Sequence, residues 1–392
     1  MSLPNPDATE FTIDRRTGQV RQAGASSPAG KYVMEFKKAA EENLFVFAKG
    51  VLGLDRLQRP LHTSVATWLQ RIPNVTGDGS YRKLLLIPRD HLKTSICSRS
   101  LPIHLLIQPK EHNVYRPGED GRNARILLAT ETVDLAKKQL RWIENRMESC
   151  EILRALWPHC VWANSRRDSK KWTEEAMLIP RTEDYPENSV EVAGVGTAIT
   201  GRHYTIQIFD DLVTFEASRS QLVMSEAIEW FKASRALMDD PDTGLEFTLG
   251  TKWAVYDLYA EIMNNDTSVE CKVMSAIENG EVIFPRPHLK NWGFTKSNLA
   301  QLQRELGSRF FLLYMNSTEN PELCPIDMTQ VRTFTVHEGK VAFAEESRDL
   351  RLDDTLPLDP RTQSQVRGIK SDSTNYDATL GRIEYLRRGK SL

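Results

Sequence analysis

Four short apolar segments constrain the fold of this chain most, because each has the length and composition of a buried strand. They are KLLLIP (83–88), RILLAT (125–130), TIQIFDD (205–211) and LEFTLGT (245–251). Strands covered on both faces lose the usual alternation and become nearly continuous apolar runs. Two later segments, 269–276 and 281–285, have a similar character. The chain therefore contains a series of strands with the composition of a parallel sheet.

Helical patterns separate these strands. Stretches with apolar residues at helical spacing occupy 133–147, 216–238, 254–263 and 295–306, and two more, 32–48 and 58–71, precede the first strand. Strands that alternate with helices predict an α/β fold, in which a mostly parallel sheet is covered by helices on both faces. The two early helices predict a helical N-terminal flank beside this sheet.

The 392 residues suffice for one large or two moderate domains. Residues 1–30 are polar and rich in Gly, Ala, Ser and Pro, which predicts a flexible N-terminal arm. Residues 31–343 contain the whole strand–helix series and form the expected main domain. After Phe343 a charged linker leads into the tail, so that 344–392 is expected to be a linker and an extension.

The bulk composition is that of an ordinary soluble intracellular protein, with 40% hydrophobic and 27% charged residues. No apolar run is long enough to cross a membrane, and the first residues lack the apolar segment of a secretory signal. The five cysteines show no C-x-x-C spacing, which speaks against a disulfide framework or a structural zinc site. Because the net charge is only −2, any contact with nucleic acid must be local or built from several copies.

The segment IPRDHLKTS (87–95) has the features of a phosphate-binding loop. Where a strand turns into a helix, a lysine such as Lys93 can reach the β- and γ-phosphates of a nucleotide, and the hydroxyl of Thr94 can bind Mg²⁺. The segment departs from the G-x-x-x-x-G-K-[ST] pattern, because Ile87 and Leu92 occupy the two glycine positions. Taken alone, the segment is also compatible with a basic surface turn.

Two carboxylates, Asp210 and Asp211, end the third apolar strand. One carboxylate at such a position can hold Mg²⁺, and its neighbour can orient or deprotonate an attacking water. The alternative is a simple helix cap, since Asp is favoured there. Another polar feature, Gly250-Thr251-Lys252, ends the next strand and is suited to sense a γ-phosphate. This order of motifs predicts a P-loop nucleoside triphosphatase with an extra strand between its two phosphate motifs.

Several of these segments together resemble the large subunit of phage terminases, the motor that packages DNA. PRDHLKTS resembles the deviant Walker A motif of that family, and ITGRHYTIQIFDDLV its Walker B region. ARILLATETVDLAKKQL is similar to the segment between them, and LGTKWAVYDLYAEIM to the coupling motif. QRPLHTSVATWL stands where the family has its adenine-side helix. The resemblance covers roughly residues 55–320 in the same order, and it implies an ATP-hydrolysing P-loop fold of the RecA-like class.

The resemblance assigns roles to individual residues. Lys93 would bind the β- and γ-phosphates, and Thr94 and Asp210 would hold Mg²⁺. Arg89 would act near the γ-phosphate, and Asp211 would be the catalytic base, although many relatives have Glu there. The full candidate ATP-binding set is Gln58, Arg89, Asp90, His91, Leu92, Lys93, Thr94 and Ser95, with Gln58 as the adenine contact. Coupling is expected from Gly250, Thr251 and Lys252, and the candidates for a trans-acting arginine finger are Arg125 and Arg202.

The tail resembles the start of the nuclease domain that follows the motor in this family. TLPLDPRTQSQVRGIKSDSTNYDATLGRIEYL begins like the opening strand of an RNase H-like domain, with Asp359 as the first candidate metal ligand. Asp372 and Asp377 are further acidic residues in this segment, but solvated tail residues are the simpler interpretation of all three. A two-metal nuclease needs several converging carboxylates, so no nuclease activity is expected from this chain.

The resemblance also implies partners. Double-stranded DNA, a portal protein and a terminase small subunit would be bound in the host cytoplasm, by a monomer that assembles into a pentameric ring on the capsid. A superfamily 2 helicase shares the core and its motif order, but too little chain follows Pro285 for a second RecA-like domain. The other alternative is a non-catalytic DNA- or portal-docking protein with a degenerate P-loop.

Overall fold

The computed structural model describes residues 28–199, 201–318, 333–337, 340–344 and 355–357. The chain divides into two compact units, Met1–Leu323 and Cys324–Leu392. The division falls before the expected boundary at 343, because the strands that begin at Thr333 pair with one another in a sheet of their own.

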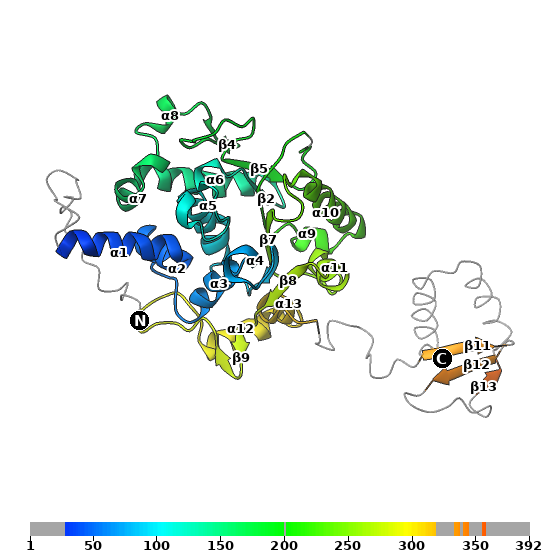
Figure 1. Ribbon diagram of the computed structural model, residues 1–392. Coiled ribbons are helices and arrows are strands. Elements are labelled where there is room, and N and C mark those ends of the chain that lie inside the picture. Colours follow the sequence, from blue (N-terminus) through cyan, green and yellow to red (C-terminus); the bar gives the residue numbers. More distant parts are fainter. Residues whose placement is uncertain (1–27, 200, 319–332, 338–339, 345–354, 358–392) are drawn as a thin grey trace. The chain divides into compact units, whose positions relative to one another are not determined.

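One large sheet dominates the first unit (Figure 1), and its eight strands lie in the order β3-β4-β5-β2-β6-β7-β1-β8. All pairs from β5 to β8 are parallel, whereas β3 and β4 form an antiparallel extension at one edge. The α/β fold with a mostly parallel sheet is therefore confirmed. The strands are β1 (Arg82–Leu86), β2 (Ile126–Thr130), β3 (Trp172–Thr173), β4 (Ala176–Met177), β5 (Val190–Gly194), β6 (Ile206–Asp210), β7 (Leu245–Gly250) and β8 (Val269–Val273).

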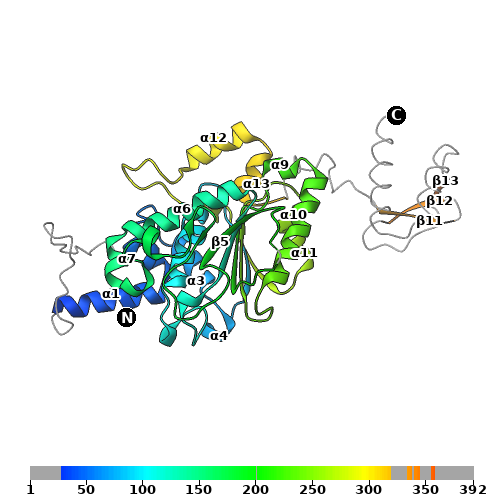
Figure 2. The same cartoon turned by 90° about the horizontal axis from the view of Figure 1, so that it is seen from above.

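Helices cover both faces of this sheet (Figure 2), with α3, α6 and α7 on one side and α10 and α11 on the other. The strands supply apolar side chains to both faces in alternation: Leu85 belongs to one core cluster, and its neighbours Leu84 and Leu86 belong to the other. The first face is packed by α1 (Pro28–Glu42), α2 (Leu44–Val46), α3 (Leu61–Leu69), α5 (Leu101–Leu106), α6 (Val133–Ser149) and α7 (Glu151–Leu156). The second face is packed by α9 (Phe215–Ser218), α10 (Gln221–Ser234) and α11 (Leu258–Asn265).

Most predicted helices occur with shifted ends. The segment expected at 295–306 is α12 (Lys296–Leu306), and the early pair corresponds to α1 and α3, with a π-helical turn at Phe47–Val51. The long helix predicted at 216–238 is instead divided into α9 and α10. Ser220 causes this division, because its side chain caps α10 by accepting a hydrogen bond from the Val223 N–H. The remaining helices are α4 (Pro73–Thr76), α8 (Ser165–Asp168) and α13 (Arg309–Met315).

The sequence pattern missed β5, which pairs with β2 in the middle of the sheet. Its apolar run is interrupted by Glu191, which is nevertheless only 5% exposed. Glu191 is tolerated there because it accepts hydrogen bonds from the Asn188 N–H, from Arg202 at 2.7 Å and from the Tyr204 hydroxyl at 2.9 Å. The strand predicted at 281–285 was wrong in its extent: only β10 (Glu281–Val282) forms, in a hairpin with β9 (Ile277–Glu278) outside the large sheet.

The second unit contains a three-stranded antiparallel sheet, formed by β11 (Thr333–His337), β12 (Lys340–Ala344) and β13 (Thr355–Pro357). The candidate nuclease ligands Asp359, Asp372 and Asp377 lie outside the described residues, as does most of the predicted flexible arm. In the part of the chain that the structure describes, no helix is both long enough and apolar enough to cross a membrane.

Buried histidines make the fold sensitive to acid. His62 on α3 receives a hydrogen bond from the Gln58 N–H at 2.8 Å on Nδ1, and its Nε2 lies 3.1 Å from the His91 carbonyl. His104 on α5 is held in the same way by the Tyr115 hydroxyl and the Ala40 carbonyl. Burial lowers the pKa of His62, of His91 and of His104 from 6.5 to about 4 in each case, so the folded state keeps these rings neutral.

We therefore expect stability to fall as the pH drops from 6.5 to 4. In this range the histidines bind protons in the unfolded chain but not in the folded chain. Each buried histidine therefore lowers the free energy of unfolding by about 3 kcal/mol once the pH reaches 4. Thermal unfolding between pH 7 and pH 4.5 measures the effect. His104→Gln should flatten the pH dependence, and the exposed control His112→Gln should leave it unchanged. Equal pH dependence in the His104 variant and the wild type would contradict the assignment.

Candidate functional site

The predicted phosphate motifs meet where β1, β7 and β6 end. The strand β7 lies between the other two, and Gly250 is opposite Leu86 on one side while Leu249 is opposite Asp210 on the other. The carboxyl ends of adjacent parallel strands lie at the same edge of a sheet, and this edge is the usual ligand-binding side of such folds. The loop after β1, the Asp pair after β6 and Thr251 after β7 are therefore neighbours.

Lys93 joins these three elements. Its ammonium donates hydrogen bonds to Asp211 Oδ2 at 2.6 Å and to Thr251 Oγ1 at 3.1 Å. The Lys93 side chain is 11% exposed. Burial alone would lower its pKa, but the negative charges of Asp211 and Asp210 outweigh this effect and raise the pKa of Lys93 above its usual value. Lys93 thus holds a full positive charge in a site where it could contact an anion.

Asp210 is the more deeply buried carboxylate, at 3% exposure. Ser98 Oγ donates a hydrogen bond to Asp210 Oδ2 at 2.6 Å. The pKa of Asp210 is raised, first by burial and then by the charge of Asp211, against the opposing effects of Lys93, Ser98 and Thr94. The sequence motifs did not identify Ser98 as a residue of this site. It lies four residues after Thr94, in the π-helical turn Ser95–Ser100, and that spacing puts both hydroxyls on one side of the helix.

Two carboxylate oxygens at this edge lack partners. Asp210 Oδ1 and Asp211 Oδ1 are both buried, and neither has a hydrogen-bond partner among the described residues. Buried polar atoms are normally satisfied, so these oxygens fit a site for a cation or ordered water. Mg²⁺ usually takes one or two carboxylates together with water and substrate oxygens. Asp210 and Thr94 supply that kind of donor set. A larger cluster, with three or more His, Cys, Asp or Glu ligands, does not occur in the described part of the chain.

The loop between β1 and Lys93 has the backbone of an anion-binding turn. Asp90 and Leu92 have left-handed conformations, with φ of 63° and 61°, and alternate with residues of negative φ. Alternation of this kind turns successive N–H groups toward one point and forms a concave nest for anions. The N–H groups of Asp90 and Leu92 have no hydrogen-bond partner among the described residues. Leu92 therefore adopts the conformation that favours glycine, at the position where the standard motif has one.

Neighbouring side chains hold this strained loop in place. His91 is buried, stacks on the Phe294 ring at 5.0 Å and bonds the Arg89 carbonyl at 2.8 Å. The Arg89 N–H donates to the Leu313 carbonyl at 3.0 Å. A left-handed leucine costs on the order of 1 kcal/mol or more, and such strain persists only where the surroundings impose it.

The segment Gly250–Lys252 is tied to the same loop. Thr251 Oγ1 donates to the Ile87 carbonyl at 3.3 Å, and the Arg89 guanidinium lies over the Trp253 ring at 5.7 Å. A side chain at Gly250 would place its Cβ 2.1 Å from the Tyr259 ring, so only glycine fits. Lys252 is buried, and its N–H donates to Asn316 Oδ1 at 3.1 Å. These contacts link the end of β7 to the loop after β1.

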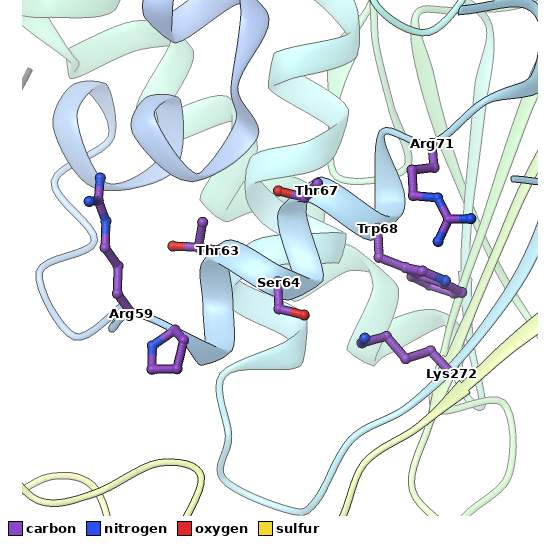
Figure 3. Close-up of a pocket in the computed structure, with 8 residues that line it drawn as sticks. Arg59, Thr63, Ser64, Thr67, Trp68, Arg71 and Lys272 are labelled. Carbon is purple, nitrogen blue, oxygen red and sulfur yellow. The ribbon is translucent and has the colours of Figure 1, made fainter. Parts of the chain in front are cut away.

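The helix α3 flanks the loop through the bond from His62 to His91. Gln58, just before this helix, donates from Nε2 to the Pro285 carbonyl at 2.9 Å, and its adenine contact remains a prediction. Beside α3 and β8 lies a groove of about 520 Å³ (Figure 3). The groove is lined by Arg59, Pro60, Thr63, Ser64, Thr67, Trp68, Arg71 and Lys272. Its volume is in the range of small-molecule sites.

The two arginine-finger candidates do not join the Lys93 site. Arg125 precedes β2 and thus lies at the opposite, amino-terminal edge of the sheet, where it is paired with Asp239 at 2.7 Å. Its side chain is only 8% exposed. Arg202 is paired with Glu191 at 2.7 Å. A finger contributed by a second copy stays a prediction, but the ion pairs of Arg125 and Arg202 hold both side chains in place within their own chain.

No model of a protein family matches this chain, and no curated protein is significantly similar to it. The interpretation of the site therefore depends on its geometry and on the sequence motifs.

The raised pKa of Asp210 predicts a stability cost at this site. Between the usual Asp pKa and the raised value, the folded state binds more protons than the unfolded state, so stability falls as the pH rises. Asp210→Asn removes the buried charge, keeps an acceptor for Ser98, and should raise the Tm at pH 7. Asp211→Asn is the matched control: it leaves buried Lys93 without its carboxylate and should lower the Tm. Differential scanning calorimetry decides, and a lower Tm in both variants would contradict the prediction.

Proposed function

We propose that this chain is the Mg²⁺-dependent, ATP-hydrolysing motor subunit of a viral terminase, which moves double-stranded DNA into a procapsid. The observation that carries the proposal is the position of Lys93. Its ammonium contacts Asp211, at the end of β6, and Thr251, at the end of β7. The three elements with the expected phosphate-binding, metal-binding and coupling motifs thus meet at one charged group.

The sheet order supports the finer assignment to the P-loop class. The strand β1, which precedes the Lys93 loop, and the strand β6, which ends at Asp210, are separated by β7, as required for a P-loop fold with an additional central strand. The loop also has left-handed residues at Asp90 and Leu92, so its backbone can bind phosphate although the sequence lacks the usual glycines.

The residues of the site have distinct tasks in the proposed hydrolysis. Lys93 exchanges Asp211 and Thr251 for the β- and γ-phosphates, and the loop N–H groups bind phosphate oxygens. Asp210, positioned by Ser98, would hold Mg²⁺ together with Thr94. A bound Mg²⁺ supplies positive charge that offsets the charge developing on the phosphates. Arg89 leaves the Trp253 ring for the γ-phosphate, and this movement passes the state of the nucleotide to Gly250–Lys252.

The remaining assignments follow from the same proposal. The DNA is held mainly through its phosphates, and the portal protein and terminase small subunit are partners in the host cytoplasm. Several copies, five in the resembling family, form a ring around the DNA. A helicase of superfamily 2 is the alternative enzyme, and a DNA- or portal-docking protein with an inactive loop is the alternative without catalysis.

We expect Mg²⁺-dependent ATP hydrolysis that is lost in Lys93→Ala, with kcat lower by about 100-fold or more, because a preorganised charge is removed from the transition state. Steady-state phosphate release measures this, and fluorescent ATP analogues measure binding. The exposed Lys138→Ala on α6 is the matched control and should behave like the wild type. Absence of both binding and hydrolysis in the wild type, even at concentrations where rings form, would favour the docking protein.

The second expectation concerns DNA. Because contact is made mainly to phosphates, affinity for duplex DNA should be independent of sequence and should fall steeply with salt. Fluorescence anisotropy with two unrelated duplexes, at several salt concentrations, tests both properties. A monomer should bind weakly, since the net charge is −2. Tight, salt-insensitive binding by the monomer would contradict the proposal.

A further inference from the structure

A third carboxylate lies beside the Asp pair, at the end of β2. Thr130, the last residue of β2, is opposite Asp210 in the sheet. The next residue, Glu131, donates its backbone N–H to the Asp211 carbonyl at 3.2 Å. Glu131 and Asp211 therefore leave two adjacent parallel strands side by side, at the edge where Lys93 lies. The sequence signal resembles that of the Asp pair, because an acidic residue directly follows the apolar run RILLAT.

The position of Glu131 is fixed from several sides. Its backbone carbonyl accepts a hydrogen bond from the Val195 N–H at 3.1 Å, so its main chain is bonded both to the loop after β6 and to the segment after β5. Its side chain is half-buried, and Oε1 accepts a hydrogen bond from the Thr214 hydroxyl. No hydrogen bond to Oε2 and no ion pair of Glu131 occur among the residues that the structure describes. One oxygen thus orients the carboxylate and the other can accept a proton.

The two carboxylates of the Asp pair have different partners. Asp211 forms an ion pair with Lys93 and sits on a left-handed backbone with φ of 49°. Its other oxygen is buried, and an aspartate is one methylene shorter than a glutamate. Asp210 is buried, accepts a hydrogen bond from Ser98, and is the carboxylate assigned to the proposed metal site. Glu131 is the longer acid, is anchored by a neutral hydroxyl, and forms no ion pair in the described part of the chain.

We infer that Glu131 is a catalytic residue, the general base that takes the proton of the attacking water, and that Asp211 serves as counterion to Lys93 until the phosphates of the nucleotide replace it. This inference rests on the proposed ATP hydrolysis. The water oxygen forms a bond to the γ-phosphorus while the bond from that phosphorus to the bridging oxygen breaks. The bridging electron pair stays with ADP. The water proton passes to a carboxylate oxygen of Glu131, which later returns it to solvent. Thr214 is the positioning residue for this base.

The test compares Glu131→Gln with Asp211→Asn, using ATP turnover, fluorescent-nucleotide affinity and the ratio of ATP to ADP bound after incubation. Glu131→Gln should lower kcat by about 100-fold or more, leave affinity for ATP within about twofold, and accumulate bound ATP. Asp211→Asn should change nucleotide affinity more than Glu131→Gln does and retain more of the turnover. Circular dichroism and Tm establish that both variants are folded.

Three further variants separate catalysis from structure. Glu131→Ala should regain turnover when formate is added, because a free carboxylate can fill the gap, whereas a purely structural role would show no rescue. Thr214→Val should lower kcat with KM unchanged, and Thr214→Ser should restore it.

Wild-type turnover in Glu131→Gln, with a loss of about 100-fold in Asp211→Asn, would overturn the inference and make Asp211 the base, while the proposed ATPase would stand. A wild-type protein that neither binds nor hydrolyses ATP would overturn both proposals. The measurement of nucleotide binding distinguishes these two failures.

Discussion

The site depends on one charge, the largely buried ammonium of Lys93. Removing a charge from water is costly unless opposite charges and hydrogen bonds compensate for it. Asp211 and Thr251 provide that compensation, and they come from the ends of two different strands. The ion pair therefore fixes the loop after β1 relative to β6 and β7. Any anion that replaces Asp211 at Lys93 must change the relation between these elements. Under the proposed function, this change would couple a bound nucleotide to movement.

The two carboxylates near Lys93 are incompletely paired. Lys93 lies near two carboxylates, and both Asp210 Oδ1 and Asp211 Oδ1 are buried without a hydrogen-bond partner among the residues that the structure describes. The raised pKa of Asp210 reflects the same imbalance, which arises from burial and from the neighbouring charge of Asp211. Unsatisfied groups of this kind are selected against in a structural core and persist where a ligand completes them. A cation with attached phosphates would satisfy the carboxylates and the loop N–H groups at once.

The sequence predicted most of the long parallel strands of the large sheet, but not all of them. The apolar runs at 83–88, 125–130, 205–211 and 245–251 all became buried strands, because burial on two faces leaves a strong composition signal. The strand β5 was missed because Glu191 breaks that signal and becomes acceptable only through Asn188, Arg202 and Tyr204, which no local pattern reveals. For the site, motif order placed Lys93 beside the Asp pair. The contributions of Ser98 and Glu131 depend on helix geometry and strand pairing, which the sequence motifs do not state.

The absence of glycine at positions 87 and 92 is the strongest sequence argument against a phosphate-binding loop. The structure weakens this argument. Glycine is common in such loops because the backbone needs left-handed residues, not because its lack of a side chain contacts the ligand. Leu92 adopts that conformation here, and its side chain packs against the hydrophobic core while His91 is clamped between His62 and Phe294. Packing of this kind can impose a backbone conformation that costs on the order of 1 kcal/mol. At position 87 the need is different: Ile87 is a buried continuation of β1, and its N–H donates to the Gly250 carbonyl. The backbone geometry for binding an anion is thus intact without the glycines. The charged side chains of the site, and not the loop backbone, therefore distinguish an enzyme from a docking protein.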